Sequence, residues 1–122
     1  MGKYTELFVS ETRKHLDALG GALETLPEGG AVAAALEEMG RMAHSIKGMA
    51  LFEEQESIAN LALALEKTCL GEGAPRLDIP FDPFREAVDL LRKMIDEVAR
   101  DGVCRSDPAR VVAELAVGAE SG

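Results

Sequence analysis

Apolar residues recur at every third or fourth position along most of this chain, which is the spacing of amphipathic helices, and no stretch alternates as a strand does. The pattern predicts five helices, at about residues 4–26, 31–50, 54–70, 82–101 and 108–117. Gly20 and Gly21 interrupt the first stripe, but the stripe keeps its phase across them, so one continuous helix is expected there. Asp82 and Asp107, each followed by proline, are typical of helix starts. Residues 118–122 are expected to fray.

The connections between the predicted helices indicate how the helices are arranged. Short links between amphipathic helices make consecutive helices antiparallel neighbours. We therefore expect an all-α fold, an antiparallel up-and-down four-helix bundle with an additional C-terminal helix, forming a single domain over residues 1–122. The residues expected to face its core are Phe8, Thr12, Leu16, Leu19, Leu23, Leu26, Val32, Leu36, Met39, Ala43, Ile46, Ala50, Ile58, Leu61, Ala62, Leu65, Cys69, Phe81, Phe84, Val88, Leu91, Ile95 and Val98.

Composition and charge exclude several classes of function. The chain has 122 residues, of which 47% are hydrophobic and 4% aromatic, enough for one aliphatic core. The formal net charge of −9 argues against nucleic acid and anionic membranes as partners, because each repels an acidic surface. No segment approaches the ~20 apolar residues of a membrane span, and the N-terminus lacks a signal-peptide pattern. Cys69 and Cys104 show neither a disulfide framework nor zinc-site spacing. We expect a cytoplasmic protein without a metal site.

The stretch AHSIKG in the middle of the second predicted helix contains the residue best suited to chemistry, His44. At about 100° per residue, His44 falls opposite the apolar arc of that helix and is therefore expected to face solvent. Arg41 and Lys47 lie three residues before and after it, so both are expected to flank the imidazole. The three residues predict a local cationic site on an acidic protein.

Two glycines lie one helical turn on either side of this histidine. Gly40 precedes His44 by four residues and Gly48 follows it by four. Glycine inside a helix lowers stability relative to alanine, so each position needs a reason. We expect the reason to be access, since neither turn would present a Cβ to a partner approaching the imidazole.

A histidine that accepts a phosphoryl group needs a free ring nitrogen, a fixed tautomer and a nearby cation. Imidazole titrates near neutral pH and so offers a free nitrogen there. Lys47 can supply the cation for the phosphoryl oxygens. Glu66, in the third predicted helix, is the candidate acceptor for Nδ1–H, which would leave Nε2 of His44 as the nucleophile. A carboxylate orients the histidine of hydrolase triads in the same way.

The runs AHSIKGMA and LALE, the latter ending at Glu66, resemble the histidine-containing phosphotransfer (HPt) domain at the start of the chemotaxis histidine kinase CheA. In that family a glutamate follows the histidine by 22 residues, the separation of Glu66 from His44, and an arginine often occupies the position of Arg41. The resemblance implies that His44 accepts a phosphoryl group from an ATP-binding kinase domain, in cis or in trans. It then passes the group to the aspartate of a response-regulator receiver domain.

The same resemblance implies that the chain is part of a protein histidine kinase and has no autonomous catalytic activity. No cofactor is expected in this domain, since ATP and magnesium would be bound by the partner domains.

The sequence departs from the family pattern at two places. Leu51–Gln55 replaces a glycine-containing turn after the second helix, and Leu63 replaces a residue that is often polar. Leu63 is predicted to lie on the same flank as Glu66 and to form an apolar rim beside His44 for the receiver domain. Together with Arg41 and Gly40, it is an expected partner-docking residue.

Simpler interpretations compete with this one. An exposed helical histidine is usually only solvated, and Glu66 and Lys47 can be ordinary surface residues. The alternative function is therefore a helical docking domain that has no phosphotransfer activity. A metal centre inside the bundle would need paired Glu-x-x-His sequences, which the chain lacks. His15 lacks a Lys-Gly partner and is interpreted as a residue at the edge of the first stripe.

Overall fold

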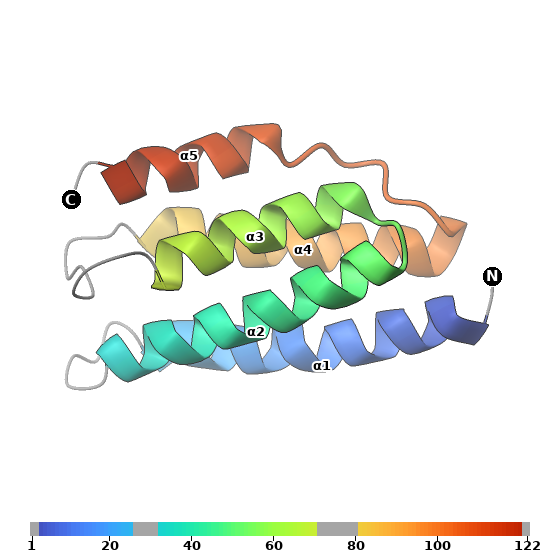
Figure 1. Cartoon of the computed structure of the whole chain (residues 1–122), viewed down its shortest axis with the longest axis horizontal. Helices are drawn as coiled ribbons and strands as arrows, with labels where there is room; N and C mark the ends of the chain where they lie inside the picture. The colour runs from blue at the N-terminus through green and yellow to red at the C-terminus, as the bar shows by residue number, and fades with distance from the viewer. Residues whose placement is uncertain (1–2, 26–31, 71–80, 121–122) are drawn as a thin grey trace.

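The structure is a computed structural model that describes residues 3–25, 32–70 and 81–120. These residues form five α-helices: α1 (Lys3–Thr25), α2 (Val32–Phe52), α3 (Glu56–Leu70), α4 (Phe81–Asp101) and α5 (Ala109–Glu120). Figure 1 shows α1 and α2 side by side, α3 and α4 forming the next layer, and α5 on the far side of that layer. The expected all-α fold, a four-helix bundle with an additional C-terminal helix, is confirmed.

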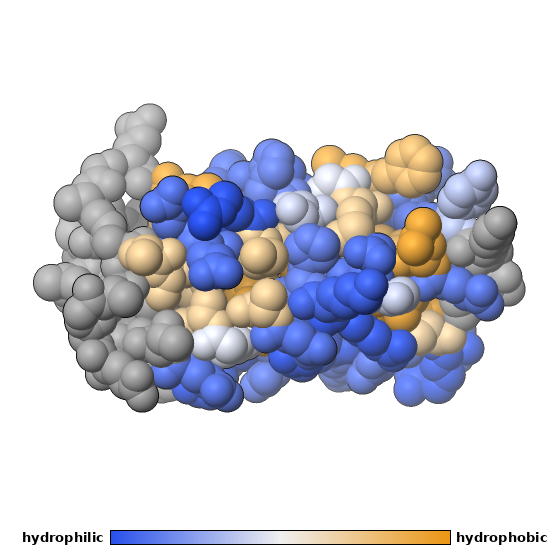
Figure 2. Space-filling view, turned by 90° about the horizontal axis from the view of Figure 1, so that it is seen from below, coloured by the Kyte–Doolittle hydropathy of each residue, from blue (hydrophilic) through white to orange (hydrophobic). Residues whose placement is uncertain are grey.

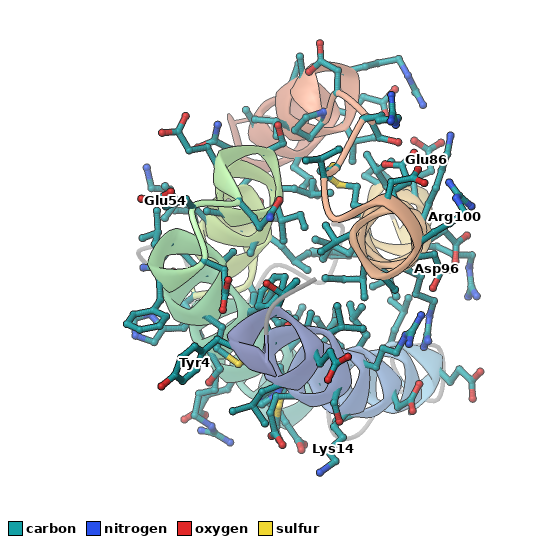
Figure 3. The ribbon with its side chains drawn as sticks, turned by 90° about the vertical axis from the view of Figure 1, so that its right-hand side faces the viewer. Tyr4, Lys14, Glu54, Glu86, Asp96 and Arg100 are labelled. Carbon is teal, nitrogen blue, oxygen red and sulfur yellow. The ribbon has the colours of Figure 1, made fainter. Side chains whose placement is uncertain are left out.

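The four helices of the bundle form a closed ring around one aliphatic core. Helix α1 packs on α2 and α4, and α3 packs on the same two helices, whereas α5 contacts α3 and α4 from outside the ring. Figure 3, an end-on view, shows side chains filling the space between α1, α2, α3 and α4. Of the described helices, none is long and apolar enough to cross a membrane.

The predicted core agrees with the observed one wherever side chains are described. Every expected core residue with a described side chain is buried except Cys69, which is partly buried and packs against the core. Leu26 lies outside the described residues, as do the side chains of Val32 and Phe81. Periodic burial of aliphatic side chains therefore accounts for these helices, including the unbroken α1 across Gly20 and Gly21.

The turn between α2 and α3 lies two residues later in the chain than predicted. Helix α2 continues two residues beyond the expected end, to Phe52, and α3 begins at Glu56 instead of residue 54. The amide of Gln55 donates to the carbonyl of Ala50 (2.8 Å), and Glu54 adopts a left-handed conformation with φ of 58°. This reversal makes α2 and α3 antiparallel neighbours, and Figure 3 labels Glu54 at its outer edge.

The end of α5 and the start of α4 also depart from the prediction. Helix α5 continues to Glu120, so residues 118–120 are helical and not frayed, while residues 121–122 lie outside the described part of the chain. Ala119 and Glu120 are good helix formers, and the helix continues through Gly118 to reach them. Asp107 caps this helix as predicted, because its Oδ1 accepts a hydrogen bond from the amide of Ala109 (2.9 Å). Helix α4 begins at Phe81, one residue before the predicted cap.

A buried carboxylate holds the connection between α4 and α5. Oε1 of Glu97 accepts hydrogen bonds from the amides of Arg105 (3.1 Å) and Ser106 (3.0 Å), and its Oε2 accepts one from the Ser106 hydroxyl (3.0 Å). Burial by itself would raise the pKa of Glu97, but these hydrogen bonds outweigh it and lower the pKa. The loop is thereby fixed in the position that places α5 against α3 and α4.

Candidate functional site

The antiparallel pairing of α2 and α3 brings His44 and Glu66 together. Nδ1 of His44 and Oε2 of Glu66 are 2.7 Å apart. The His44 side chain is 64% exposed, as predicted for the solvent face of α2, whereas the Glu66 side chain is only 17% exposed. The carboxylate therefore lies behind the imidazole at the helix interface and leaves the outer edge of the ring open.

The ionisation of Glu66 decides which ring nitrogen carries the proton. Burial by itself would raise the pKa of Glu66, but hydrogen bonds and charges from Lys47 and His44 outweigh it and lower the pKa. An ionised carboxylate can only accept hydrogen bonds, so Nδ1 of His44 must be the donor. In the neutral ring, Nε2 then keeps its lone pair and is the nitrogen available to an electrophile.

Lys47 belongs to the same cluster. Its Nζ donates to Oε1 of Glu66 at 3.0 Å, and the Lys47 side chain is mostly buried against the helix interface. The two oxygens of one carboxylate thus bind the imidazole and the ammonium group separately. The structure places the predicted cation beside the predicted nucleophile, with the carboxylate between them.

The two glycines that flank His44 have different environments. Gly48 is exposed, and a Cβ built on it would have no atom of the described chain within 4 Å other than its own helical neighbours. The predicted open access is therefore present at this turn. Gly40 is buried, and a Cβ there would overlap the side chain of Leu70. The expectation that Gly40 is a docking residue is wrong, because Leu70 from α3 covers it.

The other two expected docking residues have different surroundings. Arg41 is exposed and forms an ion pair with Glu37 on its own helix (3.0 Å), so its charge is shared with a surface carboxylate. Leu63 is partly buried and lines a groove of about 600 Å³ between α3 and α5, together with Ala64 and Val112. Its predicted contact with a receiver domain stays a prediction.

The sequence reasoning missed an apolar patch on α1 and α2. Tyr4, Leu7 and Phe52 are all exposed, Phe52 by 80%, and they line a shallow groove of about 290 Å³ together with Gly48. Figure 2 shows apolar residues exposed at the right-hand end of this face of the molecule. We define these three residues as the α1–α2 patch. The sequence did contain a sign of this patch, because the apolar residues Tyr4 and Leu7 lie off the core stripe of α1.

The α1–α2 patch is continuous with the face of α2 that carries His44. Gly48 and Phe52 follow His44 by four and eight residues, so the three lie on one side of the helix. A protein that covers the patch therefore comes close to the imidazole. Tyr4 extends the patch onto the start of α1, on the side of α2 (Figure 3).

The second histidine of the chain has a structural environment. His15 is partly buried, and its Nδ1 lies 2.8 Å from the carbonyl oxygen of Glu11 one turn earlier in α1. It is a residue at the edge of the core stripe, as predicted. Among the described residues, no group of three or more His, Cys, Asp or Glu side chains is arranged to hold a metal ion.

Comparison with protein families matches residues 3–101 to the Hpt domain. The matched range includes α1 to α4 and both members of the His44–Glu66 pair, and it ends before α5. Searches of curated proteins and of solved structures gave no significant match. The match covers most of the chain and agrees with a helical bundle that presents an exposed, carboxylate-bound histidine. The chain therefore belongs to the Hpt domain family, whose members carry out histidine phosphotransfer in phosphorelays.

Proposed function

We propose that His44 is the phosphoacceptor of this Hpt domain and that the domain belongs to a CheA-type histidine kinase. The observation that carries the assignment is the 2.7 Å contact between Nδ1 of His44 and Oε2 of Glu66 on an otherwise exposed imidazole. The AHSIKG run and the 22-residue step to Glu66 support the CheA-type context. The donor is an ATP-binding kinase domain, and the acceptor is a receiver aspartate.

The chemistry follows from the tautomer that Glu66 imposes. The Nε2 lone pair attacks phosphorus, the Nε2–P bond forms, and the bond from phosphorus to the oxygen of the donor breaks, with its electron pair leaving on the donor. The ring gains positive charge in this step, and the Nδ1–H bond to the Glu66 carboxylate stabilises it. In the second transfer a carboxylate oxygen of the receiver attacks phosphorus, and the Nε2–P electron pair returns to the ring.

The domain contributes a positioned nucleophile, and its partners contribute the remaining groups. Nucleotide and magnesium belong to the partner domains, where the metal neutralises charge on the phosphoryl oxygens. Lys47 is the cation that this chain offers to the phosphoryl group. Its Nζ is bound to Glu66 at 3.0 Å beside the ring, so it can turn to a new anion without leaving the site.

The partner domains must cover the surface next to His44 to reach its Nε2. Gly48 presents no Cβ there, and the α1–α2 patch adjoins it. Apolar side chains that are as exposed as Phe52 are more stable when a partner covers them. We assign the patch to the receiver domain, whose docking brings its aspartate over the imidazole.

The assignment is tested by incubating the domain with an active CheA-type kinase core and ATP. We expect an acid-labile phosphoryl label that is abolished by His44→Gln. His15→Gln is the matched control, because His15 is the other histidine and its ring bonds only to its own helix in the described structure. Label that survives His44→Gln would place the acceptor elsewhere. No label on the wild-type domain with an active kinase would favour the docking-only alternative.

A further inference from the structure

Gly40 of α2 is covered by the side chain of Leu70 from α3. Among the described glycines of α1 and α2, it is the one that a carbon atom of a neighbouring helix approaches most closely. A Cβ built on Gly40 would lie 2.6 Å and 2.8 Å from the two Cδ atoms of Leu70 and would also overlap its Cγ. Real Cβ atoms do not approach other carbons so closely, so an alanine here requires movement. The other described glycines of α1 and α2 show no comparable overlap with a carbon atom.

The Gly40–Leu70 contact is one helical turn from the His44–Glu66 contact. Gly40 precedes His44 by four residues, and Leu70 follows Glu66 by four. In an antiparallel helix pair, these are consecutive contacts along the same interface. A change in helix separation at the first contact is therefore transmitted to the second within a single turn of rigid helix.

We infer that Gly40 is a positioning residue: its missing side chain leaves the room that Leu70 occupies, and this lets α3 lie at the separation that joins Glu66 to Nδ1 of His44. Helix axes pack at distances of about 8–10 Å that depend on the side chains at the contact. A hydrogen bond of 2.7 Å is lost when its atoms separate by about 1 Å more. The catalytic consequence rests on the proposed function, whereas the geometric claim does not.

Leu70 cannot relieve the overlap by moving only its methyl groups. Cγ itself overlaps the added Cβ, so the whole side chain must rotate about Cα–Cβ or the helices must separate. Leu70 is 44% exposed, so rotation into solvent is the competing response. The two responses differ in their effect on the imidazole: separation breaks the Nδ1–Glu66 bond, and rotation leaves it intact.

The ring nitrogens of His44 report this bond directly. Long-range proton–nitrogen spectra of isotope-labelled protein distinguish a ring held as the Nδ1–H tautomer from one that populates both tautomers. We expect Gly40→Ala to move the His44 signals toward the mixed state. We also expect it to slow phosphoryl transfer by about 10–100-fold at saturating partner, since ~1 Å of misplacement can cost about 100-fold in rate. The partner concentration for half-maximal rate should change little, because Gly40 is buried.

Two variants separate positioning from other effects. Gly40→Ala/Leu70→Ala removes the atoms that the new methyl group meets, so it should restore the wild-type ring spectrum and rate. Gly48→Ala adds the same methyl group one turn beyond His44, where it meets nothing, so the ring spectrum should stay unchanged. If Gly48→Ala slows transfer with an unchanged spectrum, the cause is obstruction of the partner and not a shift of Glu66.

A folded Gly40→Ala protein with the wild-type ring spectrum would overturn the inference, because Leu70 would then have rotated aside. If Gly40→Ala does not fold, the double variant decides: a disturbed ring spectrum in that folded protein would overturn the inference. A wild-type domain that shows the Nδ1–H tautomer but accepts no phosphate would refute the proposed function alone.

Discussion

Replacing Glu66 by glutamine tests the link between the structure of the site and its chemistry. The side chain keeps its shape but loses its charge, and its amide group can donate as well as accept. Glu66 is 17% exposed and bonds to both His44 (2.7 Å) and Lys47 (3.0 Å). The substitution therefore removes the ionic partner of two groups and releases the tautomer of the imidazole without creating a cavity.

The expected magnitude follows from the hydrogen bond that is weakened. A hydrogen bond to a charged group contributes about 1.5–3 kcal/mol, and this one strengthens as the ring becomes positive during transfer. Its loss should slow phosphoryl transfer to His44 by about 10–150-fold, since ~1.4 kcal/mol corresponds to a factor of ten. Glu38→Gln is the matched control, because it makes the same change at an exposed position of α2 and should transfer at the wild-type rate.

The assay is rapid-quench measurement of labelled domain at saturating kinase, with circular dichroism to show that each variant is folded. A Glu66→Gln rate within twofold of wild type would refute the role of Glu66, even if the 2.7 Å contact is present. A loss equal to that of His44→Gln would also contradict it, because orientation contributes only part of the reactivity. The size of the effect, and not its direction alone, is the prediction.

Acid should weaken the same interaction. The pKa of Glu66 is lowered in the folded protein, so its ion pair with Lys47 and its hydrogen bond with His44 stabilise the fold above the unfolded-state pKa and are lost as the pH falls through the lower folded-state pKa. The free energy of unfolding should therefore decline more steeply with acid in wild type than in Glu66→Gln. Urea titrations at a series of pH values measure this, and parallel pH profiles for the two proteins would contradict it.

Three further predictions concern the patch, the core and the turn. Phe52→Asp places a charge in the α1–α2 patch and should weaken receiver binding by tenfold or more, about 1.4 kcal/mol, with little change in stability because Phe52 is exposed; equal binding would refute the docking assignment. Thr12→Val should raise the free energy of unfolding by about 1 kcal/mol, because the buried Oγ1 of Thr12 has no hydrogen-bond partner among the described residues; thermal melting that shows destabilisation would contradict this. Glu54→Gly should raise the free energy of unfolding by about 0.5–1 kcal/mol, because relief of the left-handed conformation of Glu54 (φ of 58°) exceeds the entropy that glycine loses on folding; an unchanged urea midpoint would argue against strain at this turn.

The sequence alone was sufficient to predict which segments are helical and which of their residues are buried in the core. Burial of every third or fourth residue is a local pattern, so the stripes that include Leu16, Ile46 and Leu91 could be recognised without knowledge of the fold. Helix ends were less certain, because they depend on backbone hydrogen bonds across the turn. The left-handed Glu54 ended α2 at Phe52, and nothing in the local pattern specified that conformation.

The chemical site was only partly accessible from the sequence. His44 could be placed on a solvent face from its phase, but its contact with Glu66 depends on the register of α2 against α3, which tertiary packing sets. The Glu66 carboxylate binds both His44 and Lys47, and this too depends on how α2 packs against α3. From the sequence, Lys47 was predicted to bind the phosphoryl oxygens. The sequence did not indicate that Lys47 forms an ion pair with Glu66 in the unmodified domain.

Gly40 and Gly48 show the physical reason for this division most clearly. In sequence they are equivalent, each four residues from His44, so both were expected to provide access. In the structure Gly48 is open and Gly40 lies under Leu70, which is 30 residues away along the chain. Periodicity determines which side of a helix faces the core, because that is a property of the helix itself. Which side chain a neighbouring helix presses against a given residue depends on how the helices pack together, and only the folded molecule decides it.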